Sequence, residues 1–192
     1  GVSTDARLAL SQLLGDVDRD LAAAFRGGAD AAAVAGARAR AVERVVAHVW
    51  RAWVGDANGA ALFAVGGFGR GLLFPHSDVD LLVLVAARPA PAQTRALEAF
   101  FGCLWDIGLK PGHAVRSSAQ CRELAIADVT VFTSLLDARL IAGDRAFAGA
   151  LAALVEDPAI WPPGEFITAK HAEQIARHAR FNDTAYNLEP NL

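Results

Sequence analysis

The sequence predicts an α+β fold in which a small mixed sheet is flanked by helices. Two kinds of pattern alternate along the chain. Long stretches with apolar residues every three or four positions indicate amphipathic helices, and short apolar runs bounded by glycine or proline indicate buried strands. With 54% hydrophobic and 20% charged residues in 192 positions, the chain can build a sizeable core. We expect N-terminal helices before this core and a helical segment after it.

The first part of the chain is expected to be helical. Apolar residues spaced three or four apart end at Gly27, and Asp30 stands where its side chain can cap a second helix, which should stop near Asp56. We therefore assign residues 1–56 to helices that pack on the core.

Residues 57–157 are expected to form the core. Its predicted strands are residues 60–65, 78–85 and 113–116, and its predicted helices are residues 93–105, 118–128, 129–141 and a last one that restarts after Gly143-Asp144. A proline-rich break then separates residues 158–192, where we expect a polar helix over residues 165–181 and a loop-like tail.

The most informative stretch is AVGGFGRGLLFPHSDVDLLVLV, residues 64–85. Side chains alternate faces along a strand, so Asp78 and Asp80 at its start point to the same side. Two neighbouring carboxylates repel each other unless a divalent cation lies between them. The pair therefore predicts a metal site for phosphoryl or nucleotidyl transfer. The structural alternative is a pair of solvated aspartates at the start of a strand.

The turn before this pair is rich in glycine. Gly66 and Gly67, with two more glycines in the next four positions, allow positive φ angles and a close approach of backbone N–H groups to an anion. Arg70 in the turn and Ser77 just before the aspartates are candidate phosphate contacts. The spacing matches neither the dinucleotide-binding glycine motif nor a P-loop. A hairpin turn with an incidental arginine is the alternative interpretation.

Two further residues have both a structural and a catalytic interpretation. His113 is either a catalytic base or a hydrogen-bonded structural histidine, and it faces away from Arg116 if the strand is regular. Asp128 either caps the helix that follows it or serves as a third carboxylate. The residues alone leave both choices open.

Composition argues against several classes of partner. The net charge of −3, without long charged runs, gives no case for nucleic acid or an anionic membrane as the main partner. No apolar run approaches the roughly 20 residues of a membrane span. The two cysteines form no CxxC pair, so we expect reduced thiols in a cytoplasmic protein. Because the sequence contains no Met, we also expect a domain excised from a longer protein.

The order Gly66-Gly67, ten residues, Asp78-Val79-Asp80 resembles the signature of the polymerase-β-like nucleotidyltransferase superfamily. The longer string GGFGRGLLFPHSDVDLLVL is similar to one family within it, the nucleotidyltransferase domains of bifunctional uridylyltransferase/uridylyl-removing enzymes, which modify the nitrogen-signalling PII protein. The stretches LWDIGLKPGHAVRS, ADVTVFTSLLDARLIAGD and KHAEQIARHARFNDTAYNLEPNL extend the resemblance from about residue 60 to the end. The first sixty residues match only as generic helices.

The resemblance implies a polymerase-β-like fold and a definite chemistry. In such enzymes paired aspartates hold two Mg²⁺ ions, a glycine turn seats the triphosphate of UTP, and a tyrosine hydroxyl of the PII protein attacks the α-phosphate while pyrophosphate leaves. On this chain, Asp78 and Asp80 would be the metal ligands. Gly66 and Gly67 would form the phosphate cradle, with Ser77 as a triphosphate contact. Cations at these positions would neutralise the charge that develops in the reaction.

The resemblance leaves the third carboxylate and the nucleotide base open. The superfamily commonly carries a third carboxylate on a neighbouring strand, but the predicted strand 113–116 has none, so Asp128 is assigned this role. Uridylyl transfer from UTP and adenylyl transfer from ATP need the same metal chemistry. A catalytically silent nucleotide-sensing or interaction module and a small-molecule nucleotidyltransferase are the alternative functions.

Overall fold

The computed structural model describes residues 1–56, 59–86 and 88–180. The helices are α1 (Thr4–Arg26), α2 (Ala31–Trp53), α3 (Gly66–Gly69), α4 (Pro91–Asp106), α5 (Ser118–Ala127), α6 (Val129–Leu136), α7 (Ala146–Val155) and α8 (Pro163–Arg180). The strands are β1 (Ala60–Ala64), β2 (Val79–Val85), β3 (Pro111–Ser117) and β4 (Arg139–Gly143). The predicted α+β fold, with a small mixed sheet and flanking helices, is confirmed.

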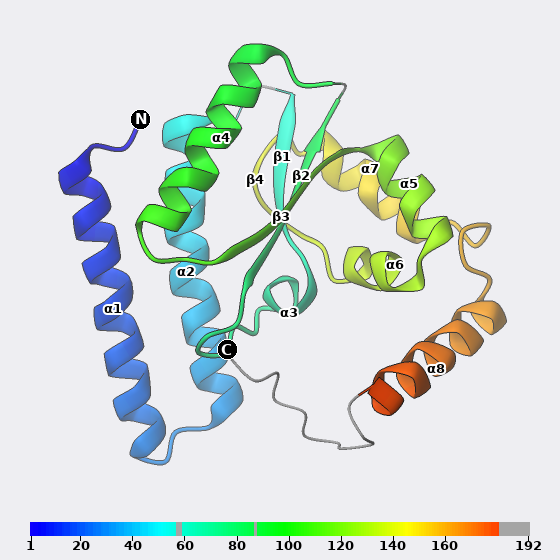
Figure 1. Ribbon diagram of the computed structural model, residues 1–192, viewed down its shortest axis with the longest axis horizontal. Helices are drawn as coiled ribbons and strands as arrows, with labels where there is room; N and C mark the ends of the chain where they lie inside the picture. The colour runs from blue at the N-terminus through cyan, green and yellow to red at the C-terminus, as the bar shows by residue number, and fades with distance from the viewer. Residues whose placement is uncertain (57–58, 87, 181–192) are drawn as a thin grey trace.

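The four strands form one sheet in the order β3-β2-β1-β4. Strand β1 runs antiparallel to both β2 and β4, whereas β2 and β3 are parallel, so the sheet is mixed. Helices α1, α2 and α4 lie on one side of it and α5, α6 and α7 on the other, as Figure 1 shows. Strand β2 is therefore covered on both faces, and Asp80 is its one exposed position.

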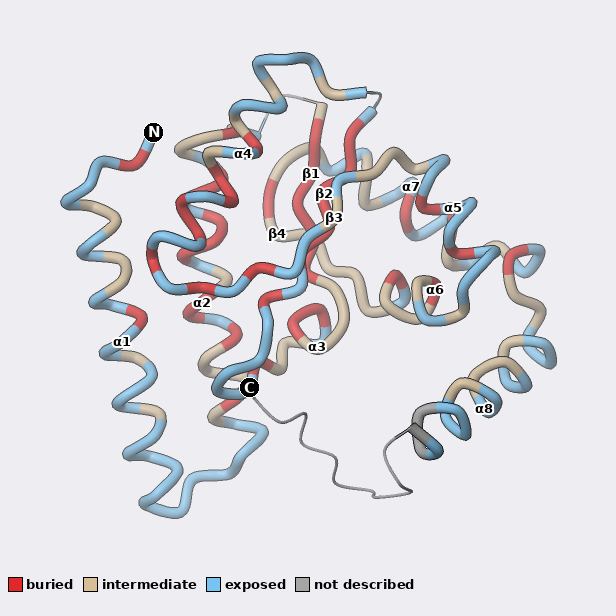
Figure 2. Tube along the Cα trace, in the orientation of Figure 1, coloured by how far each residue is buried: buried red, intermediate tan, exposed pale blue. Residues whose placement is uncertain are grey.

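Two apolar layers enclose the sheet. One lies between the sheet and α1, α2 and α4, and it includes Leu81 and Val83 of β2. The other lies between the sheet and α5, α6 and α7, and it includes Leu82 and Leu84. Figure 2 shows β1 and β2 buried along most of their length. Because side chains alternate along a strand, Asp80 shares the face of Leu82 and Leu84 and points to the α5–α6 side.

The N-terminal helices form a hairpin whose second member carries most of the buried contacts. As predicted, Asp30 caps α2, accepting a hydrogen bond from the Ala33 amide at 2.9 Å. Trp50 of α2 is fully buried. In contrast, much of α1 is exposed (Figure 2), and Leu14 is its one fully buried position.

One predicted element is wrong. Residues 129–141 were expected to form a single helix, but α6 ends at Leu136 and Arg139–Gly143 form strand β4. The apolar residues of this short segment fit the period of a helix as well as that of a strand. Residues 139–143 form a strand because the edge of β1 provides backbone hydrogen-bond partners. Asp137 therefore ends the helix, and Arg139 begins a strand.

The C-terminal helix is confirmed as α8, which begins two residues earlier than expected. The predicted loop over residues 182–191 lies outside the described residues, and nothing tests the boundaries drawn at residues 56 and 157. Among the described helices, none combines the length and apolar character that crossing a membrane requires.

Gly69 of α3 marks the closest approach between the glycine turn and the end of α6. A Cβ atom at this position would lie 2.1 Å from the Asp137 carbonyl oxygen. We expect Gly69→Ala to lower the free energy of unfolding by about 1–3 kcal/mol, because backbone must move to make room. Gly102→Ala on the exposed side of α4, where a Cβ meets nothing, should instead raise it by about 0.5–1 kcal/mol. Denaturant unfolding measures both, and equal stabilities would contradict the tight packing at Gly69.

Candidate functional site

The glycine turn is fixed against the start of β2 by the backbone. Val65, the residue before α3, donates its N–H to the Asp80 carbonyl oxygen at 3.1 Å. Gly66 follows with φ +56°, a left-handed conformation that glycine adopts without strain. The turn therefore leaves β1 directly beside Asp80.

The Asp80 carboxylate lies between two glycines. A Cβ added to Gly66 would be 3.3 Å from Oδ2, and a Cβ added to Gly112 would be 2.8 Å from Oδ1. Gly112 of β3 is the register partner of Asp80. The carboxylate thus occupies space that a side chain at position 112 would need. Gly112 was not predicted as a functional residue, because Pro111-Gly112 has the composition of an ordinary turn.

The electrostatics of Asp80 favour a bound cation. Partial burial raises the pKa of its carboxyl group above the ordinary value, and the neighbouring charge of Asp78 raises it further. A divalent cation between the two carboxylates removes this repulsion. Mg²⁺ suits such a pair, since it is often held by one or two carboxylates and completes its shell with water and phosphate oxygens. Asp78 and Asp80 are the residues that would hold it.

Asp128 lines the same cavity as Asp80. This cavity, of about 430 Å³, is lined by Gly66, Asp80 and Asp128 among others. The Asp128 Oδ1 atom accepts a hydrogen bond from the Thr130 amide at 2.7 Å, so its predicted capping role is confirmed. Within residues 1–56, 59–86 and 88–180, no three His, Cys, Asp or Glu side chains gather closely enough to hold one metal ion. The role of Asp128 as a third carboxylate stays a prediction.

Two predicted phosphate contacts lie outside this cavity. The Arg70 guanidinium forms an ion pair with Asp137 at the end of α6. Ser77 lies in the loop that enters β2 and lines a separate cavity of about 530 Å³ beside the α1–α2 hairpin. His76, next to Ser77, has φ +67°, an uncommon conformation for a residue other than glycine. The nucleotide-binding roles of Arg70 and Ser77 remain predictions.

His113 and Arg116 face opposite sides of β3, as the strand pattern predicts. The His113 ring stacks on Phe101 of α4, with 3.9 Å between the ring centroids. Arg116 lines the cavity that contains Asp80. The stacking gives His113 a structural role, and its role as a catalytic base stays a prediction.

Arg139 forms hydrogen bonds with the backbone of the glycine turn, a role that was not predicted from the sequence. Its guanidinium donates hydrogen bonds to the carbonyl oxygens of Gly69 (3.3 Å) and Phe68 (3.4 Å), and it pairs with Glu43 of α2 at 2.6 Å. These contacts tie α3 to α2 and β4. They escaped prediction because residue 139 was expected within a helix.

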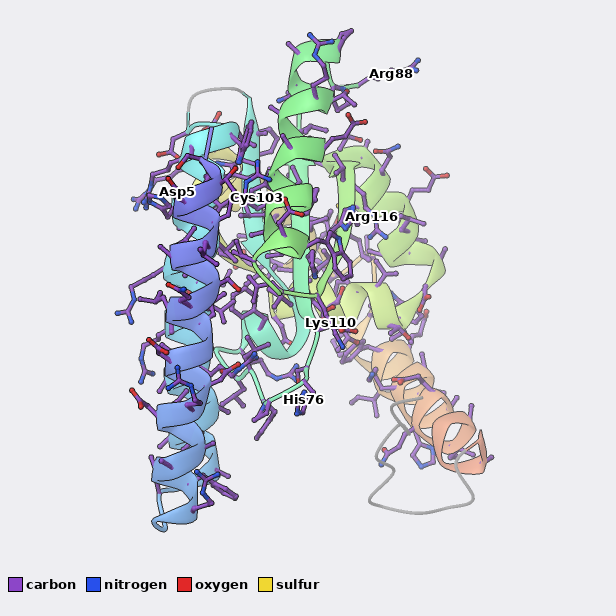
Figure 3. The ribbon with its side chains drawn as sticks, turned by 60° about the vertical axis from the view of Figure 1, so that its left-hand side comes forward. Asp5, His76, Arg88, Cys103, Lys110 and Arg116 are labelled. Carbon is purple, nitrogen blue, oxygen red and sulfur yellow. The ribbon has the colours of Figure 1, made fainter. Side chains whose placement is uncertain are left out.

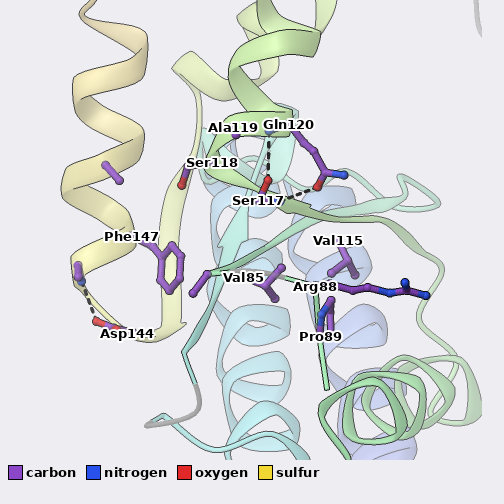
Figure 4. Close-up of a pocket in the computed structure, with 13 residues that line it drawn as sticks. Val85, Arg88, Pro89, Val115, Ser117, Ser118, Ala119, Gln120, Asp144 and Phe147 are labelled. Atoms are coloured by element: carbon purple, nitrogen blue, oxygen red, sulfur yellow. Dashed lines mark hydrogen bonds between the residues drawn. The ribbon is translucent and has the colours of Figure 1, made fainter. Parts of the chain in front are cut away.

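A larger cavity, of about 880 Å³, lies at the opposite end of β2 and β3 (Figure 4). Its polar groups are largely engaged in helix capping. Ser117 and Gln120 form a capping box at the start of α5, and Asp144 accepts a hydrogen bond from the Ala146 amide at 2.9 Å. Asp144 is the one carboxylate that lines it. The smaller cavity at Asp80 is therefore the better candidate for metal-dependent chemistry.

Comparison with known proteins points to the same segment. Residues 48–110 match a family described as a nucleotidyltransferase domain. The bifunctional uridylyltransferase/uridylyl-removing enzyme of Pseudomonas putida is 46% identical over 170 residues, which cover 88% of this chain and 19% of that protein. The enzyme of the same description from Xanthomonas axonopodis pv. citri is 44% identical over 194 residues, which cover 100% of this chain and 22% of that protein. The chain thus spans about a fifth of the length of these relatives.

Among solved structures, the toxin–antitoxin complex MntA-HpeT aligns with a TM-score of 0.38 and 12% identity over 73% of this chain and 96% of that chain. A likeness at this level carries no argument about function.

The space beside Gly112 yields a specific prediction. We expect Gly112→Ala to displace the Asp80 carboxylate and to weaken divalent-cation binding by about 10–100-fold, the range found when the groups that orient metal ligands are changed. The unfolding midpoint should change little, since the added methyl group meets a side chain rather than backbone. Calorimetric titration with Mg²⁺ in the presence of UTP measures the affinity, with Gly102→Ala as the control. An unchanged affinity in Gly112→Ala would contradict the arrangement.

The raised pKa of Asp80 predicts how the metal-free chain depends on pH. The folded state favours protonated Asp80, so the stability linked to that proton is fully present below about pH 3.8 and is lost as the pH rises through the raised pKa. Asp80→Asn, which cannot ionise, should therefore stabilise the metal-free chain at pH 7, and the gain should shrink as the pH falls toward 3.8. Urea unfolding in the presence of a chelator at several pH values tests this. A variant less stable than wild type at pH 7 would count against it.

Proposed function

Because the chain contains a nucleotidyltransferase domain of the kind that bifunctional uridylyltransferase/uridylyl-removing enzymes carry, we propose that it transfers UMP from UTP to a tyrosine of the PII signalling protein and releases pyrophosphate. One observation carries this proposal. The Asp80 carboxylate lies between two glycines at the open end of an otherwise buried strand, where the charge of Asp78 acts on it.

The proposed reaction needs little covalent chemistry from the protein. Asp78 and Asp80 would hold Mg²⁺, which supplies positive charge against the negative charge that develops on the phosphates. Gly66 and Gly67 let the backbone approach the triphosphate closely, because neither has a Cβ that would obstruct it. Asp128 faces the cavity from the α5–α6 junction and is the proposed third carboxylate.

The proposed acceptor is the hydroxyl group of a PII tyrosine, and the proposed setting is the cytoplasm. A catalytically silent nucleotide-binding module is the second candidate. It is favoured by two observations: Asp128 caps a helix, and no three His, Cys, Asp or Glu side chains among the described residues gather closely enough to hold a metal.

The decisive test is transfer from labelled UTP to PII in the presence of Mg²⁺. We expect Asp80→Asn to fold but to lose at least about a hundredfold in transfer rate, since a metal at this position contributes several kcal/mol to catalysis. Asp20→Asn on the exposed surface of α1 makes the same chemical change away from the site and should leave the rate unchanged.

Two outcomes would contradict the proposal. Transfer at the wild-type rate by Asp80→Asn would remove Asp80 from the chemistry. Mg²⁺-dependent UTP binding by the wild-type chain, without transfer to any PII protein, would favour the silent module. Repeating the binding measurement with each of the four nucleoside triphosphates tests the choice of UTP over ATP.

A further inference from the structure

Arg116 lies in the cavity that holds Asp80 but at its other end. On β3 it pairs in register with Leu84, and it is four residues beyond Gly112, the partner of Asp80. Four residues of strand span about 13 Å. Figure 3 shows Arg116 on the α5 side of β3, whereas Lys110 lies toward the loop that carries His76. Arg116 and Asp80 thus line one cavity from two separated positions.

Arg116 is a cation without a partner in the described part of the chain. It is partly buried, yet none of the ion pairs or hydrogen bonds among the described residues involves it. Arg70 and Arg139, by contrast, pair with Asp137 and Glu43. A partly buried guanidinium that no protein carboxylate neutralises is available to bind an anionic ligand.

Groups of opposite charge therefore lie at the two ends of the cavity. At one end Asp80 is influenced by the like charge of Asp78. At the other end, the charge of Arg116 acts on the buried thiol of Cys121, a core residue of α5, and opposes the rise of the thiol pKa that burial causes. Asp128 also lines the cavity but forms no ion pair with Arg116 in the described structure.

We propose that Arg116 binds a phosphate group of the nucleoside triphosphate, at the end of the cavity away from the metal-binding carboxylates. The planar guanidinium presents paired donors that match two oxygens of one phosphate. Mg²⁺ at the carboxylates would be shared with oxygens of one part of the triphosphate, which leaves another phosphate for the guanidinium. The assignment rests on the proposed nucleotidyltransferase function and adds a substrate-binding residue to it.

The test compares ligands that differ only in phosphate. Binding of UTP, UMP and uridine to the 192-residue chain is measured by calorimetry with Mg²⁺ present, for wild type, Arg116→Ala and Arg116→Lys. We expect Arg116→Ala to weaken UTP binding by about 10–100-fold, the loss expected for a charged hydrogen bond, and to leave uridine binding unchanged. Arg116→Lys should restore part of the affinity. Arg95→Ala, at an exposed arginine of α4, is the matched control.

Kinetics give a second readout. In transfer assays Arg116→Ala should raise the KM for UTP and leave the KM for PII unchanged. A raised KM for PII with unchanged UTP binding would overturn the assignment, because Arg116 would then contact an anionic group of the PII acceptor rather than a phosphate of UTP. Equal losses for UTP and uridine would also overturn it, because they would show a structural role. If Arg116→Ala does not fold, the lysine variant carries the test, and full loss of UTP binding in a folded Arg116→Lys would count against a charge-based contact.

Failure of the assignment is distinguishable from failure of the proposed function. Wild-type chain that binds no UTP contradicts both. UTP binding and transfer by wild type, with Arg116→Ala indistinguishable from it, overturns the assignment alone and leaves the nucleotidyltransferase function standing.

Discussion

Asp78 immediately precedes β2 and Asp80 is the second residue of that strand, and the like charge of Asp78 disfavours ionisation of Asp80. Asp80 is the one exposed position of β2, and both burial and Asp78 disfavour its ionised form. A surface aspartate pair would relax by turning into water. Here the carboxylate is confined between Gly66 and Gly112, so a cation is the simplest means of stabilising it.

The surrounding elements keep that confinement rigid. The Val65 amide bonds to the Asp80 carbonyl oxygen and fixes the glycine turn against β2. Arg139 donates hydrogen bonds to the carbonyl oxygens at the end of α3 and pairs with Glu43, so these contacts link α2, β4 and the turn. Apolar layers on both faces of the sheet hold β2 in place. The geometry around Asp80 therefore depends on contacts between elements that are far apart in the sequence.

Sequence patterns were sufficient to predict the features of the fold that depend on residues close together in the chain. The opposite faces of His113 and Arg116 follow from strand alternation, and the cap at Asp30 follows from helix-end chemistry. Strand β4 was missed because its partner, the free edge of β1, lies about eighty residues away. The roles of Gly112 and Arg116 depend on the parallel pairing of β2 with β3, which no pattern within either segment reveals.

The most direct test of this account is a crystal structure of the chain with Mg²⁺ and a UTP analogue that cannot be cleaved between its α- and β-phosphates. The account predicts metal density between the carboxylates of Asp78 and Asp80, with the triphosphate beside Gly66 in the cavity of about 430 Å³. Nucleotide bound in the cavity of about 880 Å³ at the opposite end of the sheet, or bound with no metal at the two aspartates, would contradict it.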